Sequence, residues 1–104
     1  MIIKDGANIR GLNWRMRKAI KAADTIWRGF GRELVITSGL DGEHGPLSLH
    51  YFGCAVDLRS RYFRQGEARK AAEELQRVLG HDYDVVVEPT HIHVEYDPEL
   101  ARWP

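Results

Sequence analysis

The chain has 104 residues, of which 43% are hydrophobic and 29% are charged, and its formal net charge at pH 7 is zero. This composition is typical of one small globular domain, which we place at residues 1–104, and the sequence contains no low-complexity tract and no internal repeat. No apolar run approaches the ~20 residues that cross a bilayer, so we expect no membrane span. The first residues lack the apolar stretch of a signal peptide, so we expect the protein to be cytoplasmic at synthesis.

The distribution of charge and the cysteine content further limit the kinds of site that this chain can form. Residues 1–32 contain eight Lys or Arg and two Asp, a net charge of +6, and residues 33–104 carry the balancing −6. A basic segment of this kind is typical of a solvated helix face, and also of a surface that attracts a polyanion such as nucleic acid or a cell-wall polymer. The single cysteine, Cys54, excludes an internal disulfide and a zinc site built mainly from cysteine.

The first predicted element is a helix over about residues 9–30. Its apolar residues recur at spacings of three and four, which gives one apolar stripe. The stripe consists of Leu12, Met16, Ile20, Ala23, Ile26 or Trp27, and Phe30. Asn8 is the expected N-cap, and Gly29 and Gly31 are expected to end the helix.

Two short strands and a second helix follow. Residues 33–38 and 54–58 are apolar, partly β-branched runs that predict strands, and the glycine-containing segment 39–49 between them predicts a loop. Residues 65–79 predict a helix that stops at Gly80. Its expected apolar face consists of Ala68, Ala71, Ala72, Leu75, Val78 and Leu79.

The last two predicted strands, residues 83–88 and 91–96, are separated only by Pro89 and Thr90. A two-residue connection predicts a hairpin, in which Glu88 pairs with His91 and Val86 lies opposite His93. The second strand alternates strictly. Its two faces are Ile92, Val94 and Tyr96 on one side and His91, His93 and Glu95 on the other.

These histidines and carboxylates suit a hydrolytic zinc site. Such a site uses three protein ligands and one water, whose pKa falls to about 7. The segment 48–57 offers His50 and Asp57 as ligands, and the hairpin offers a histidine, with Glu88 and the second histidine left for catalysis. A serine-type triad of Ser48, His50 and Asp57 is disfavoured, because Ser48 and His50 are too close in sequence and no Gly-x-Ser-x-Gly turn is present.

The same residues carry a resemblance to a known family. Ser48-x-His50-x-x-Gly53-x-Ala55-x-Asp57 resembles the zinc signature of the D-Ala-D-Ala carboxypeptidase and L-alanyl-D-glutamate endopeptidase family. That family includes phage endolysins and vancomycin-resistance D,D-peptidases, and it shares its fold with the Hedgehog signalling domain. The resemblance implies an α+β fold, a small antiparallel β-sheet with two helices packed against it.

The resemblance also implies functional roles for the hairpin residues, and two family signatures assign these roles differently. His91-Ile-His93 resembles the His-x-His signature, which implies His50, Asp57 and His93 as zinc ligands and a catalytic role for His91 at the scissile carbonyl. Glu88-Pro-Thr-His91 resembles the Glu-Pro-Trp-His signature, which implies His91 as the ligand instead. We favour His93, because the Ile-His-Val context is closer and position 90 is not Trp. In both versions Glu88 is the candidate general base.

Substrate binding departs from the family pattern. Family members often carry an arginine shortly after the Ser-Gly that ends the first strand, and it holds a substrate carboxylate. Here Ser38-Gly39 is followed by Leu40-Asp41, which favours endopeptidase over carboxypeptidase activity. Arg59 or Arg61 is a candidate replacement, and the Ser48 hydroxyl is expected to support the site through a ligand or a turn amide.

The function predicted from the sequence is therefore a zinc-dependent peptidase that acts on peptidoglycan stem peptides with one Zn²⁺ ion. We expect a monomer that reaches the cell wall by phage-type release and has no nucleic-acid partner. A non-catalytic zinc-binding domain of the same fold is the main alternative. A nucleic-acid module built on the basic helix is the other alternative.

Overall fold

A computed structural model describes residues 1–39 and 55–96, which form a five-stranded sheet and two helices. The strands are β1 (Ile2–Ile3), β2 (Val35–Ser38), β3 (Ala55–Arg59), β4 (Tyr83–Val87) and β5 (His91–Tyr96), and the helices are α1 (Trp14–Gly29) and α2 (Glu67–Leu79). The strand order is β1-β2-β3-β5-β4. Only β1 and β2 run parallel, and the other neighbouring strands are antiparallel.

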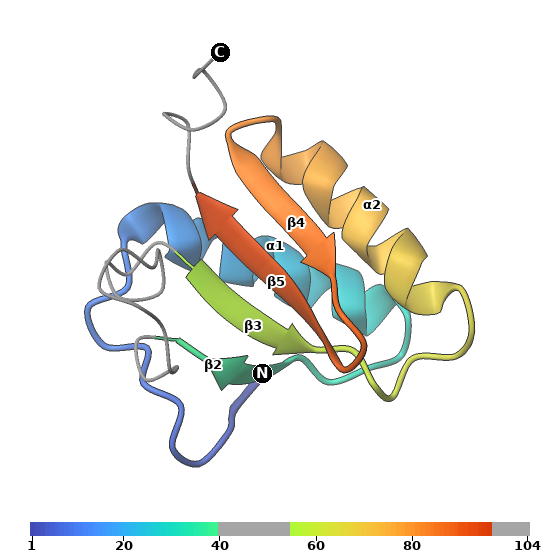
Figure 1. Cartoon of the computed structure of the whole chain (residues 1–104), viewed down its shortest axis with the longest axis horizontal. Coiled ribbons are helices and arrows are strands. Elements are labelled where there is room, and N and C mark those ends of the chain that lie inside the picture. The colour runs from blue at the N-terminus through green and yellow to red at the C-terminus, as the bar shows by residue number, and fades with distance from the viewer. Residues whose placement is uncertain (40–54, 97–104) are drawn as a thin grey trace.

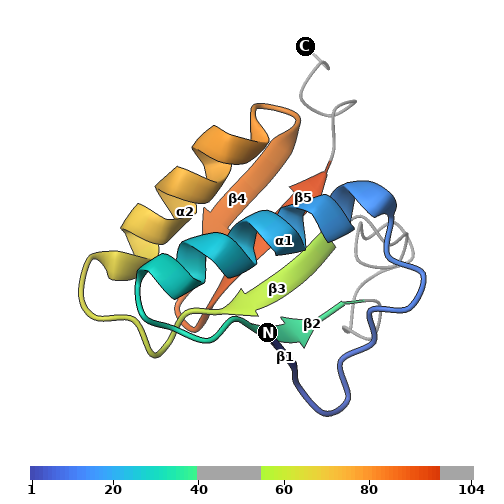
Figure 2. The ribbon, with the colours of Figure 1, turned by 180° about the vertical axis from the view of Figure 1, so that it is seen from behind.

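Both helices cover the same face of the sheet (Figures 1 and 2). Figure 2 looks onto the helices, and Figure 1 looks onto the face that they leave uncovered. The predicted α+β class, an antiparallel sheet with two helices packed against it, is therefore confirmed. The strand β1 was not predicted, because two residues give no alternation to detect; it adds to the edge of the sheet beside β2.

The core lies between the helices and the covered face of the sheet. Strand residues of one parity enter it, and helix residues at three- and four-residue spacing meet them. Its largest fully buried side chains are Trp27, Met16, Leu34, Ile36, Leu58, Leu75, Ile92, Val56 and Val94. Burial of this set supplies the main drive for folding, at roughly 1.5–3 kcal/mol for each large side chain.

The helix α1 is shorter at its start than predicted. It begins at Trp14, and the cap is Asn13, whose side chain accepts a hydrogen bond from the Arg15 amide at 2.9 Å. The expected cap at Asn8 was wrong, although the Asn8 side chain accepts a similar bond from the Arg10 amide at 3.0 Å. Leu12 is buried even so, because the segment before the helix also packs on the core.

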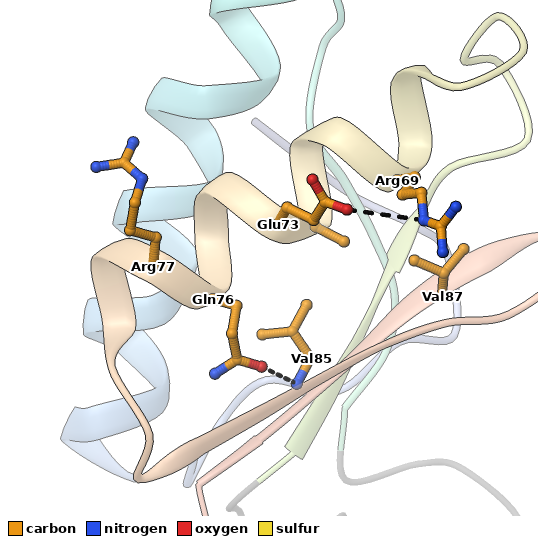
Figure 3. Close-up of a pocket in the computed structure, with 7 residues that line it drawn as sticks. Arg69, Glu73, Gln76, Arg77, Val85 and Val87 are labelled. Carbon is orange, nitrogen blue, oxygen red and sulfur yellow. Dashed lines mark hydrogen bonds and ion pairs between the residues drawn. The ribbon is translucent and has the colours of Figure 1, made fainter.

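The helix α2 ends as predicted at Gly80, which adopts a positive φ of 88°. Val78 was predicted on its apolar face, but that was wrong: the residue is 54% exposed. The side chain of Gln76 lies on the inner side instead and ties the helix to the edge strand β4 (Figure 3). Its amide nitrogen donates to the carbonyls of Gly80 and Tyr83, and its amide oxygen accepts from the amide of Val85.

All but Gly39 of the predicted loop 39–49, including Ser48, lies outside the described residues, and so does His50. The same is true of Cys54 and of the tail from Asp97. No helix in the described part of the chain is long and apolar enough to cross a membrane.

Candidate metal and catalytic site

The uncovered face of the sheet carries the polar residues of β3 and β5. The register pairs Asp57 with His93 and Arg59 with His91 across these two strands. Because side chains alternate along a strand, the buried Val56, Leu58, Ile92 and Val94 point to the helices, and their polar neighbours point the other way. The β3–β5 register is therefore what joins the first predicted motif to the second.

Asp57 and His93 are in direct contact. His93 Nδ1 lies 2.9 Å from Asp57 Oδ1, and the two side chains are only 23% and 13% exposed. His91 is farther away: its Nε2 lies 3.7 Å from the same oxygen, at 34% exposure. Both hairpin histidines thus approach one carboxylate, and His93 approaches it more closely.

The charges around His93 favour its protonated form in the metal-free protein. The pKa of His93 is raised above its ordinary value, first because its ring donates a hydrogen bond to Asp57 and then because the negative charges of Asp57, Glu95 and Glu88 lie nearby. Partial burial acts in the opposite direction. The surroundings are therefore built to hold positive charge at this ring.

Glu88 stands where the hairpin turns. Its backbone amide donates to the carbonyl of His91 at 2.8 Å, and Val86 pairs with His93. The predicted hairpin register is thus confirmed, which puts Glu88 on the same face as both histidines. Glu88 is exposed, so its carboxylate is accessible to a ligand on this face.

The spacing of the donor atoms at this site is close to that around a tetrahedral zinc ion. Ligand atoms at 2.0–2.1 Å from such an ion lie about 3.3 Å from one another. The separations of 2.9 and 3.7 Å from Asp57 Oδ1 to the two histidine nitrogens fall on either side of that value. By this distance Asp57 and either histidine fit as two of three ligands.

The complete ligand set is not contained in the described residues. Within 1–39 and 55–96, no group of three or more His, Cys, Asp or Glu side chains is arranged to hold a metal ion. The third predicted ligand, His50, lies outside that part of the chain, as does Ser48.

Glu95 is a site residue that the sequence reasoning did not assign. Its carboxylate lies 3.8 Å from His93 Nε2, on the side of the ring opposite the nitrogen that meets Asp57. A metal-binding histidine usually has its second nitrogen oriented by a carboxylate or carbonyl. The strict alternation of β5 was the available signal, because it already put Glu95 on the face of His93.

Arg59, predicted to bind substrate, lies beside this site. It is two residues from Asp57 on β3 and pairs with His91. Its backbone carbonyl accepts a hydrogen bond from the buried indole of Trp27 at 3.1 Å. A cavity of about 230 Å³ adjoins it, and Arg61 and Lys4 also line this cavity.

Comparison with known proteins adds no assignment: no family model matches this chain, and no curated protein matches it.

Proposed function

We propose that this chain is a zinc-dependent peptidase that cleaves peptidoglycan stem peptides, with the Hedgehog and D,D-peptidase subtype of the α+β fold. The observation that carries the proposal is the 2.9 Å contact between His93 Nδ1 and Asp57 Oδ1. These two residues come from the two separate motifs that resemble the family signatures. A second histidine, His91, and the carboxylate of Glu95 lie beside this pair on the same face.

In this proposal Asp57 and His93 hold one Zn²⁺ ion together with His50. A zinc ion with three protein ligands lowers the pKa of a bound water to about 7, which makes a nucleophile available at neutral pH. Glu95 orients the His93 ring from its Nε2 side.

Two other side chains carry the proton and charge chemistry. The Glu88 carboxylate accepts a proton from the attacking water and returns it to the nitrogen of the leaving amine. The His91 imidazole donates a hydrogen bond from Nε2 to the scissile carbonyl oxygen as negative charge develops there. His91 Nδ1 lies 3.3 Å from the Thr90 hydroxyl, which holds the ring in orientation.

The choice of peptidoglycan rests on the resemblance of the motifs alone. It favours an endopeptidase, since the arginine expected after Ser38-Gly39 is missing. The protein then acts as a monomer on the cell wall after phage-type release, with no nucleic-acid partner.

The experiment is digestion of purified peptidoglycan by the zinc-loaded protein, followed by mass spectrometry of the products. Loss of terminal D-Ala, release of the stem peptide from L-Ala and opening of a cross-link give three different masses. Glu88→Ala should abolish cleavage and leave bound zinc unchanged, since Glu88 is not a ligand here. Fully zinc-loaded wild-type protein that never cleaves would instead support a non-catalytic zinc-binding domain.

A further inference from the structure

A cavity of about 230 Å³ opens beside the candidate site, at the end of the sheet where β3 ends and β5 begins. Its walls come from segments that are far apart in the sequence. They are Lys4 after β1, Thr37 in β2, Arg59 and Arg61 at and after the end of β3, and Thr90 with His91 at the hairpin. Three of the six lining residues are permanently cationic, and none is a carboxylate.

Backbone hydrogen bonds fix these walls in place. The Lys4 amide donates to the Ile36 carbonyl at 3.0 Å, which holds Lys4 beside Thr37. The Ser60 amide donates to the Thr90 carbonyl at 3.1 Å, which ties the segment after β3 to the hairpin turn. Ser60 itself is buried. The cations are therefore mounted on segments that the sheet already orders, which lowers the entropy cost of binding.

The cations of the cavity have no carboxylate partner in the part of the chain that the structure describes. Other arginines do: Arg28 pairs with Asp24 at 3.0 Å, and Arg32 pairs with Glu67 at 3.5 Å. The two threonine hydroxyls are already engaged. Thr37 donates to the Asp57 carbonyl at 3.3 Å, and the Thr90 hydroxyl lies 3.3 Å from His91 Nδ1. The recognition chemistry of this cavity is thus supplied by the ammonium and guanidinium groups.

We propose that this cavity is an oxyanion-binding pocket, in which Lys4, Arg59 and Arg61 together hold a carboxylate or phosphate group of a ligand. Guanidinium groups match such planar or tetrahedral oxyanions with paired hydrogen bonds. Three like charges around one cavity repel one another, and an anion between them removes that repulsion. The contribution of Lys4 to this pocket comes from the fold, because no sequence signal connects position 4 with positions 59 and 61.

The pocket also indicates where a ligand of the neighbouring site carries its negative charge. It shares His91 with that site, and Arg59 is two residues along β3 from Asp57, a distance of about 7 Å at the rise of a strand. A ligand held at both places carries its negative charge about that far from the group at Asp57 and His93. This last step rests on the proposed peptidase function, whereas anion binding by the pocket does not.

The test begins with metal-free protein, so that it needs no turnover. Inorganic phosphate and, separately, acetate are titrated into isotope-labelled protein, and amide shifts are followed by NMR. We expect saturable shifts at Thr37, Arg61 and Thr90, weakened by added sodium chloride because the binding is ionic. The anion that produces these shifts, whether phosphate, acetate or both, is the oxyanion that fits the pocket.

Matched variants decide whether the pocket is responsible. Arg61→Gln and Lys4→Gln should each weaken binding of the better anion, by roughly tenfold for a lost charge-assisted hydrogen bond. Arg77→Gln removes the same charge from α2, outside this cavity, and should leave binding unchanged. Equal weakening in all three variants, or no saturable shift with either anion, overturns the proposal.

A second measurement separates this proposal from the peptidase proposal. If the protein cleaves peptides, Arg61→Gln should raise KM for a substrate with a free carboxylate near the scissile bond and leave KM for its amidated counterpart unchanged. If the protein binds anions as described but cleaves no peptide, the anion-binding pocket is supported and the peptidase proposal is wrong. If the protein cleaves peptides but its KM does not depend on the substrate carboxylate, the pocket does not bind the substrate.

Discussion

His93 on β5 meets Asp57 on β3 with 2.9 Å between Nδ1 and Oδ1, and the strand register pairs the same two residues. The contact depends on that register. A slip by one residue would turn every side chain of β5 to the opposite face, so that His93 would point into the core and Ile92 to solvent. Burial of Ile92 and Val94 therefore fixes the position of His93.

Asp57→Asn should weaken zinc binding by at least about tenfold, because an amide is a poorer ligand than a carboxylate and the charge near His93 is lost. Isothermal titration calorimetry with Zn²⁺ measures the change. The control is Asp84→Asn, the same substitution at an exposed position of β4. Equal affinity in the Asp57 variant and the wild type would remove Asp57 from the ligand set.

Glu95→Gln and Glu88→Gln should affect different steps. Glu95 lies 3.8 Å from His93 Nε2, so its change should lower zinc affinity by roughly tenfold to a hundredfold, as loss of a carboxylate partner does in other metal sites. Glu88→Gln should leave zinc affinity unchanged and reduce kcat, because it removes the proton acceptor. Zinc titrations and peptide kinetics on both variants check this, and the reverse pattern would exchange the two roles.

Trp27→Phe should destabilise the fold by about 1–3 kcal/mol, because the partly buried Arg59 carbonyl loses the indole donor at 3.1 Å. The ring is also fully buried and packs edge-on against Phe63, with 5.4 Å between ring centroids. Urea unfolding followed by circular dichroism gives the free energy of unfolding. Trp14→Phe is the control, since Trp14 is 63% exposed and should change stability little.

Gln76→Ala should cost about 1–3 kcal/mol, since it leaves the carbonyl of Tyr83 and the amide of Val85 without their partner (Figure 3). Hydrogen exchange should rise first at Val85, on the edge strand that Gln76 covers. Glu73→Ala is the control, because Glu73 is exposed and its carboxylate pairs with Arg69 on the helix itself. Unchanged protection at Val85 would show that this bond does not stabilise the edge.

Gly39→Ala should destabilise the protein by about 1–3 kcal/mol, because a Cβ atom at this position would overlap the carbonyl oxygen of Asn8. Relieving the overlap requires the backbone after β1 to move away from the end of β2. Gly29→Ala is the matched control: a Cβ there meets nothing within 4 Å, and alanine favours a helix. Thermal melts of both variants should therefore shift in opposite directions.

The sequence by itself determined most of the local structure. Periodicity located both helices and four of the five strands, because apolar spacing reports directly which face of an element is buried. It also predicted the hairpin register at Pro89-Thr90, since a short connection leaves few ways to pair the strands. It misplaced the cap of α1, because Asn8 and Asn13 are equally suitable by residue type. In the structure Gly11, between them, adopts a left-handed φ of 78°, and the helix begins only at Trp14.

Only the tertiary structure decided which distant residues meet. Nothing in the spacing between positions 57 and 93 states that they pair; the order β3-β5-β4 inserts the last strand beside β3 and so brings them together. The same insertion gave His93 its close approach to Asp57. On the other side of β3, the order β1-β2-β3 joined Lys4 to Arg59 and Arg61 around one cavity. Residue types define the available chemistry, whereas strand order and register, fixed by burial of the opposite face, determine where that chemistry is assembled.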